Sequence, residues 1–238
     1  YDFPIENSLR FDGSSYLSRT PTTAGNRKTW TWSGWVKRTS FGDNDDLFGC
    51  YTGTLSDTGL FSVRFSSDST LRVDASTLSW RKTLDLYRDS SSWYHIVVYF
   101  DTTETAPADR IKLYVNGKQL ISFDTSNTIS LNTDYPINST NSHYISLNAY
   151  TTSGNEINGY MANIQFIDGQ ALDQYFFGEF KDNIWVPYNA FSTDNSGTAS
   201  DGDTATNSYG TNGFHLDFAD SSNIGNDVSG NNNDWTVN

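Results

Sequence analysis

Two neighbouring stretches decide the fold, SSWYHIVVYFD (residues 91–101) and RIKLYVNGKQL (residues 110–120). The first alternates between two rows of side chains: Tyr94, Ile96, Val98 and Phe100 in one, Trp93, His95, Val97 and Tyr99 in the other. Such alternation is typical of a β-strand, in which successive side chains point to opposite faces. The second stretch contains Asn116-Gly117, a dipeptide that favours a type I′ turn because both positions tolerate positive φ. The two stretches therefore predict paired strands and then a return strand, which would carry Leu120, Ile121 and Phe123.

Strand patterns recur on both sides of this pair. Residues 29–37 (TWTWSGWVK) carry apolar side chains on both faces: Trp30, Trp32 and Val36 on one, Trp35 on the other. This pattern predicts a central strand that is covered on both faces. Two further strands are predicted to have one shared face each: Phe61, Val63 and Phe65 within residues 59–65, and Tyr160, Ala162, Ile164 and Phe166 within residues 159–167. No window of about 12 residues has helical apolar spacing, although a short helical turn is expected near residues 172–180.

Composition narrows the class of protein. Aromatic residues make up 15% of the 238 residues, and their large side chains allow a β core to be built from few positions. The net charge is −13 and the 15 Lys and Arg are scattered, so we expect no nucleic-acid partner. We also expect no membrane insertion, because no apolar stretch is long enough for a spanning helix. Cys50 is the single cysteine and lies in an apolar run, so a buried thiol is expected and an internal disulfide is excluded.

The texture of the chain changes after about residue 187. Residues 1–187 are predicted to form the sandwich, and residues 188–238 a loop-rich extension that either packs on it or connects to a further domain. Within the extension, residues 192–212 are almost devoid of apolar side chains, which predicts a long loop. The apolar trio at residues 235–237 should pair in a sheet rather than fray. Because the chain begins at Tyr1 rather than Met, we expect it to be one domain of a longer protein.

Four motifs, in this order along the chain, resemble the concanavalin A-like/laminin-G-like family. They are SLRFDGSSYLS (8–18), WTWSGWVK (30–37), the pair at 91–101 and 110–120, and GYMANIQFIDGQAL (159–172). The resemblance implies an all-β, two-sheet antiparallel jelly-roll sandwich. It does not by itself imply a function, because such sandwiches host glycosidases, lectins and adhesion modules alike.

Three phrases are also similar to uncharacterised structural proteins of marine tailed bacteriophages. They are YLSRTPTTAGNRKTWTWSGWVKR (16–38), YGTNGFHLDF (209–218) and DVSGNNNDWTVN (227–238). This similarity implies a non-enzymatic structural, fibre or decoration module of a virion, an extracellular particle. Its partners would be other virion proteins or copies of itself, together with a glycan of the host surface. The alternatives are a soluble lectin-like carbohydrate-binding domain and, least favoured, a glycoside hydrolase.

Catalytic motifs are sparse. Glycoside hydrolysis requires two carboxylates about 5–10 Å apart, and related jelly-roll hydrolases are expected to carry them as Glu-x-Asp-x-x-Glu. Here the glutamates are few and widely separated along the chain: Glu6, Glu104, Glu156 and Glu179. No Gly-x-Ser-x-Gly elbow occurs, a single cysteine cannot build a Cys/His zinc site, and His95 in mid-strand is expected to be a packing residue. We therefore expect no enzymatic activity.

Two loops rich in oxygen-bearing side chains make calcium a candidate ligand. Asp43 and Asp45 lie in one, and Asp227, Ser229, Asn231 and Asn233 alternate in the other like the first ligands of a calcium loop. The sixth position of that loop is Asn232 rather than glycine, and Asx turns explain the same composition without metal. We favour the turns and expect no other cofactor.

Aromatic side chains near predicted loops are the candidates for stacking on a sugar in a shallow site. They are Tyr51, Tyr87, Tyr150 and Tyr209. Trp30, Trp32 and Trp93, in contrast, alternate into predicted strands and are expected in the core.

Overall fold

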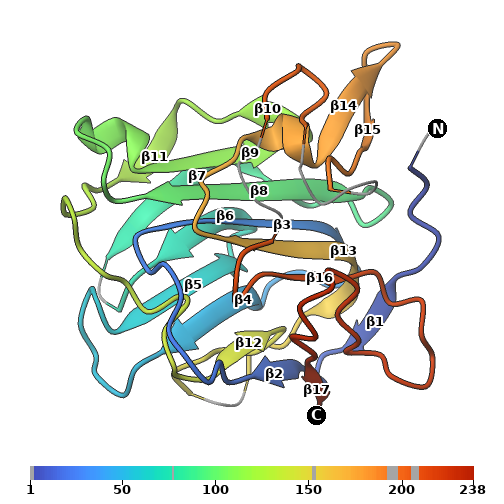
Figure 1. Cartoon of the computed structure of the whole chain (residues 1–238), viewed down its shortest axis with the longest axis horizontal. Helices are drawn as coiled ribbons and strands as arrows, with labels where there is room; N and C mark the ends of the chain where they lie inside the picture. The colour runs from blue at the N-terminus through green and yellow to red at the C-terminus, as the bar shows by residue number, and fades with distance from the viewer. Residues whose placement is uncertain (1–2, 77, 152–153, 192–197, 205–208) are drawn as a thin grey trace.

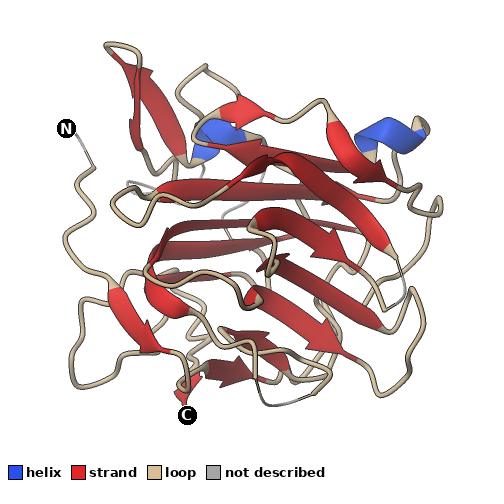
Figure 2. Ribbon diagram, turned by 180° about the vertical axis from the view of Figure 1, so that it is seen from behind, coloured by secondary structure: helices blue, strands red, loops and turns tan. Residues whose placement is uncertain are grey.

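The computed structural model describes residues 3–76, 78–151, 154–191, 198–204 and 209–238, and it is built almost entirely from β-strands in two large facing sheets (Figures 1 and 2). This confirms the all-β, two-sheet antiparallel prediction. Among the described residues, the helices are the 3₁₀ turns η1 (Pro107–Asp109) and η2 (Gln174–Phe176). The second lies where the helical turn was expected. Neither is long and apolar enough to cross a membrane.

Sheet A has seven strands. Its order is β1 (Leu9–Asp12), β13 (Asn158–Asp168), β3 (Thr29–Arg38), β8 (Tyr94–Asp101), β9 (Ile111–Val115) and β10 (Lys118–Gln119), with β16 (Phe214–Leu216) also paired to β13. Sheet B has eight strands. Its order is β11 (Phe123–Ser126), β7 (Ser79–Leu86), β6 (Thr70–Asp74), β5 (Leu60–Phe65), β4 (Asp45–Tyr51), β12 (His143–Ile145), β2 (Leu17–Arg19) and β17 (Thr236–Val237). A separate hairpin joins β14 (Gly178–Lys181) to β15 (Ile184–Pro187) and projects beyond the sheets (Figure 1).

The main core fills the space between the two sheets and is rich in aromatic rings. Trp30 of sheet A stacks on Phe100 of the same sheet at 4.6 Å between ring centroids and meets Phe61 of sheet B edge-on at 5.1 Å. Trp30, Trp32 and Val36 are fully buried there, as their shared face predicted. Large rings from both sheets thus meet in one layer, which lets a chain of modest hydrophobic content bury a continuous core.

The pair of strands at residues 91–120 forms as predicted, but its return strand is short. Asn116 and Gly117 have φ of +48° and +76°, as a type I′ turn requires. Pairing with β9 ends at Gln119, and Ile121 is 86% exposed. Phe123 then begins β11, which pairs with β7 of sheet B. The predicted return strand is therefore wrong beyond Gln119, because the chain leaves sheet A there and crosses to sheet B.

A β-bulge in β13 overturns the shared face predicted for residues 160–166. The register to β3 shifts between Ala162 and Gln165, and Asn163 within this gap has φ of +48°. A bulge inserts an extra residue and so exchanges the faces of the residues on either side. Ile164 and Phe166 accordingly join the core between the sheets, whereas Ala162 lies on the outer face of sheet A.

The outer face of sheet A, the face turned away from sheet B, is also covered. A second buried cluster joins Val97 and Tyr114 of the sheet to apolar residues from the part of the chain between 167 and 209: Ile167, Leu172, Phe176, Phe177, Ala190, Phe191, Ala199 and Tyr209. This confirms that β3 runs through a sheet covered on both faces.

The described part of residues 188–238 contributes to both sheets. β16 pairs with β13 in sheet A, and β17 pairs with β2 in sheet B. The predicted pairing of the terminal apolar trio is thus confirmed. Trp235 is 3% exposed and meets Phe214 edge-on at 4.9 Å. The residues on either side of position 187 therefore share one core.

Two adjacent carboxylates at the start of β4 are buried. Asp45 forms an ion pair with Arg38, whose NH2 lies 2.7 Å from Oδ2, and both side chains are almost fully enclosed. Asp46 accepts hydrogen bonds from Ser62 Oγ and from Asn148 Nδ2, the latter at 3.3 Å. Burial raises the pKa of Asp46 to about 6, because a carboxylate removed from water is less stable than the neutral acid.

The raised pKa of Asp46 predicts a specific dependence of stability on pH. An unfolded aspartate has a pKa of about 3.9. Between about pH 4 and 6, Asp46 therefore keeps its proton in the folded state and loses it in the unfolded state. The contribution to stability is complete below that range and is lost as the pH rises through it. In Asp46→Asn this loss should disappear. Between pH 4 and 7 the wild type should lose about 2–3 kcal/mol more than the variant, as measured by urea unfolding at each pH.

Asp43→Asn is the matched control, because Asp43 is exposed in the same loop and its substitution makes the same change in charge. This variant should keep the pH slope of the wild type. An Asp46→Asn slope that equals the wild-type slope would contradict the assignment.

Candidate functional site

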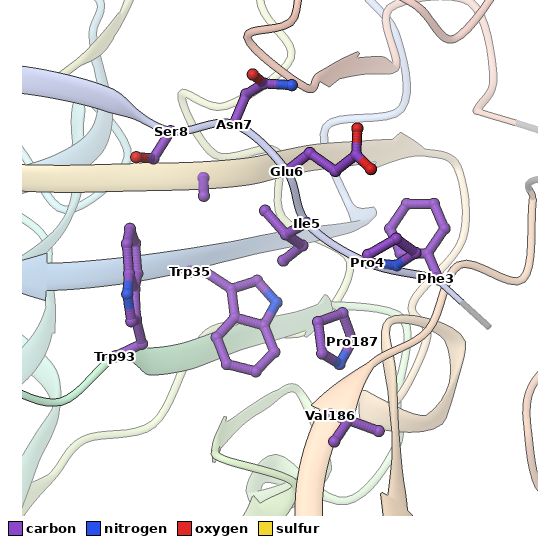
Figure 3. Close-up of a pocket in the computed structure, with 11 residues that line it drawn as sticks. Phe3, Pro4, Ile5, Glu6, Asn7, Ser8, Trp35, Trp93, Val186 and Pro187 are labelled. Carbon is purple, nitrogen blue, oxygen red and sulfur yellow. The ribbon is translucent and has the colours of Figure 1, made fainter. Parts of the chain in front are cut away.

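A pocket of about 470 Å³ opens on the outer face of sheet A, where the cover of that face ends (Figure 3). Its volume lies within the range of about 300–1,000 Å³ that is usual for small-molecule sites. Aromatic and aliphatic side chains dominate its lining: Phe3, Pro4, Ile5, Glu6, Asn7, Ser8, Trp35, Trp93, Ala162, Val186 and Pro187.

Adjacent strands of sheet A provide the floor. Trp35 of β3 lies directly opposite Ala162 of β13 in the register of the two strands, and the small Ala162 side chain leaves space beside the indole. Trp93 immediately precedes β8, the other neighbour of β3, and is half-buried. One indole therefore comes from β3 and the other from the residue just before the neighbouring strand β8.

One wall consists of residues 3–8, an irregular segment that leads into β1. No hydrogen bond or ion pair joins these residues to any other residue that the structure describes. Phe3 and Ile5 are half-buried. Apolar contact, rather than directional bonding, therefore holds this wall.

The other wall is the end of β15, which a chain of stacked rings ties to the floor. Trp185 Nε1 donates to His95 Nδ1 at 2.9 Å, and His95 Nε2 lies 2.9 Å from Ser33 Oγ. The imidazole also stacks on Trp35, with ring centroids 4.7 Å apart. Burial lowers the pKa of His95 to about 3. His95 is therefore a neutral packing residue, and it keeps Nδ1 free to accept from the hairpin.

The lining of the pocket is mostly apolar. Of the described residues that line the pocket, Glu6 is the one that carries a charge, and its side chain is exposed. The side chain of Trp35 is 9% exposed, and its Nε1 has no hydrogen-bond partner. Trp30 and Trp32 also lack a partner for Nε1, but they lie in the closed core. In Figure 3 the nitrogen-bearing edge of Trp35 faces the side formed by Pro4 and Ile5. An unpaired buried donor costs about 1–3 kcal/mol.

The four candidate tyrosines separate into two groups. Tyr87 and Tyr209 are 7% and 2% exposed, so the expectation that they are accessible near loops is wrong. Their rings pack in the two apolar cores instead. Tyr51 and Tyr150 come together, with ring centroids 5.2 Å apart in an edge-on contact, and Tyr150 is 45% exposed. This pair remains a candidate surface, separate from the pocket.

The oxygen atoms of the proposed calcium loop are engaged in hydrogen bonds. Asp227 Oδ1 accepts from the backbone N–H groups of His215 and Ser229, and Oδ2 accepts from Ser229 Oγ and the N–H of Asn233, all at 2.8–2.9 Å. The amide nitrogens of Asn231 and Asn233 donate to backbone carbonyls of residues 210–213. The loop thus ties β16 to the terminal strand.

The other acidic loop is no better arranged for a metal. Asp43 is exposed, while Asp45 is directed into its ion pair with Arg38. Over the described ranges, the structure contains no group of three or more His, Cys, Asp or Glu side chains placed to hold a metal ion.

Sequence reasoning did not single out the pocket. Trp93 was expected in the core, which is wrong: it stands at the outer face, where its ring lies 6.4 Å from that of Tyr160. The position of Trp35 did contain a clue. Trp35 alternates to the other face of its strand from Trp30 and Trp32, so its indole faces away from the core between the sheets. The spacing of residues along the sequence, however, does not reveal whether another segment of the chain covers the Trp35 indole.

Comparisons with known proteins agree with this fold. A family model described as the concanavalin A-like lectin/glucanases superfamily matches residues 11–174. A heptameric SAP-like pentraxin from Limulus polyphemus is similar in structure, with a TM-score of 0.51 and 17% identity over 71% of this chain and 79% of that chain. No curated protein matches the chain.

Two further solved structures have lower scores. A sialidase from Trypanosoma rangeli has a TM-score of 0.49 and 15% identity over 70% of this chain, which spans only 26% of the sialidase. The CBM40 of a Ruminococcus gnavus sialidase, bound to α2,3-sialyllactose, has a TM-score of 0.45 and 10% identity over 66% of this chain and 88% of that chain. At such identities structural likeness concerns the fold alone. The family model covers well over half of the sequence, and the chain therefore belongs to the concanavalin A-like lectin/glucanase superfamily.

Proposed function

We propose that this protein is a non-enzymatic carbohydrate-binding module whose site is the pocket on the outer face of sheet A. The observation that carries the proposal is the pair of indoles, Trp35 and Trp93, that neighbouring strands present in this pocket. A pyranose ring has an apolar face of C–H groups, and aromatic rings with a few placed polar groups are the usual means of binding such a ligand.

The polar groups around the indoles suit a sugar. Glu6, Asn7 and Ser8 provide acceptors and donors along the wall. The backbone of residues 3–8 is likewise not paired with other described residues. Hydroxyl groups of a saccharide both donate and accept, so they can use such a mixed set.

The lining also supports binding without hydrolysis. Among the described residues that line the pocket, Glu6 is the one carboxylate, whereas glycoside hydrolysis uses two carboxylates about 5–10 Å apart. Glu104 and Glu179 are engaged elsewhere, with Tyr99 and Lys181 respectively.

We further propose that the module belongs to the particle of a tailed bacteriophage, where it contacts other virion proteins or copies of itself and a glycan of the host surface. The similarity of residues 16–38, 209–218 and 227–238 to virion structural proteins supports this reading. Repeated copies on one particle would convert weak glycan contacts into avidity.

Replacement of Trp93, the more exposed of the two indoles, tests the carbohydrate site. Trp93→Ala should weaken binding to a glycan ligand, found on a glycan array, by about tenfold or more, because truncating a central aromatic anchor costs about 2 kcal/mol. Isothermal titration of both proteins with that glycan measures the ratio. Trp93 is only half-buried, so the variant should keep its thermal stability within a few degrees.

Tyr150→Ala is the matched control, because Tyr150 is an exposed aromatic residue outside the pocket. It should leave the affinity unchanged. The opposite pattern, a loss of binding in Tyr150→Ala and none in Trp93→Ala, would move the site to the Tyr51–Tyr150 pair.

Calcium should have only a small effect on this protein. The oxygens of Asp227 already accept four hydrogen bonds, which an ion would have to displace. Stabilisation by a weakly bound ion grows only as RT ln(1 + [L]/Kd). Thermal melts in millimolar calcium and in chelator should therefore differ by a few degrees at most. A shift of ten degrees or more that Asp227→Asn abolishes would establish a calcium site.

The virion assignment predicts where the protein is found. Mass spectrometry of purified phage particles should detect its peptides at a constant ratio to the capsid proteins through a density gradient. Recovery only from the particle-free fraction would show that the protein is a soluble lectin-like domain instead.

A further inference from the structure

The charge around the pocket carries information about its ligand. Of the 11 residues that line it, Glu6 is charged and none is Lys, Arg or His. The indole floor and the aliphatic walls are apolar, so an ionic group placed against them would lose part of its hydration. A desolvated carboxylate is costly unless a cation or several hydrogen-bond donors compensate it.

Arg10 and Lys37 carry positive charge on the same face of the sheet, and neither is among the residues that line the pocket. Arg10 is already engaged. Arg10 lies over the ring of Tyr160 with its Cζ 5.2 Å from the centroid. Its NH2 donates to Asn158 Oδ1 at 2.6 Å, and its NH1 donates to the Gly159 carbonyl at 3.3 Å. The ring of Tyr160 lies 6.4 Å from that of Trp93, and Arg10 is not among the lining residues. An acidic sugar stacked on the indoles would therefore find no guanidinium within the pocket.

The whole molecule adds to this selection. The net charge of −13 produces a negative potential that disfavours the approach of anions. Glu6 sits at the pocket itself, where the repulsion of a second carboxylate at short range is strongest.

From these observations we infer that the site selects neutral saccharides and excludes acidic ones such as sialic or uronic acids. This inference rests on the proposed function, since it takes the pocket to be the carbohydrate site. The inference adds the chemical class of the ligand, a neutral saccharide. Glu6 is the residue that we expect to discriminate against acidic saccharides.

Matched pairs of oligosaccharides that differ only in an acidic group test the inference. Lactose against 3′-sialyllactose and xylotriose against its glucuronate-branched form are two such pairs on a wider array. Among the pairs whose neutral member binds, the acidic member should bind at least about tenfold more weakly in low salt. This gap should narrow as salt rises, because screening weakens the repulsion between exposed charges.

Glu6→Gln should narrow the gap between the neutral and the acidic member by about three- to tenfold, because it removes the charge that repels the acidic member. Glu104→Gln is the control, because it makes the same change in net charge at a residue outside the pocket, and it should leave the gap as it is. Acidic members that bind as well as neutral ones, or a gap that Glu6→Gln does not change, would overturn the inference and leave the carbohydrate site standing. Failure of every glycan to bind would overturn the proposed function itself.

Discussion

The rest of the structure depends on the burial of sheet A on both of its faces. Its inner face packs on sheet B through Trp30 and Trp32, and its outer face packs under residues that follow β13. A strand that is buried on both faces must carry apolar side chains at successive positions, as β3 does with Trp35 and Val36. Because the outer cover is incomplete, the outward-facing indoles Trp35 and Trp93 lie where this cover ends, and the pocket forms there.

The hydrogen bond from Trp185 to His95 connects this cover to the floor of the pocket. His95 can accept it only while its imidazole is neutral, and burial keeps the imidazole neutral well below physiological pH. Gly117 and Gly178 both lie so close to the Trp185 indole that a Cβ at either would come within 2.1 Å of it. The position of the β14–β15 hairpin therefore depends on two residues without side chains and on one neutral histidine.

The sequence was sufficient for the features that depend on local alternation. The two faces of β3, the turn at Asn116-Gly117 and the pairing of the terminal trio were all predicted, since side-chain period and φ preference act within a few residues. The bulge at Asn163 was not predictable, because a positive φ at an asparagine leaves no mark on the apolar pattern. The burial of Tyr87 and Tyr209 was missed for a related reason: both lie near loops in sequence, but distant segments pack over them.

The candidate site illustrates the same limit more strongly, because five separate parts of the chain build it: residues 3–8, Trp35, Trp93, Ala162 and residues 186–187. Their contributions to recognition differ in kind. The floor lies on or beside paired strands, so the orientation of its indoles is fixed before a ligand arrives, and little ordering cost remains to be met on binding. The wall of residues 3–8 has no hydrogen bond to other described residues and can adjust at small cost. Stacking on the indoles of the floor should therefore decide which face of a sugar is bound. The wall contributes Glu6, whose carboxylate disfavours a negatively charged sugar at that position.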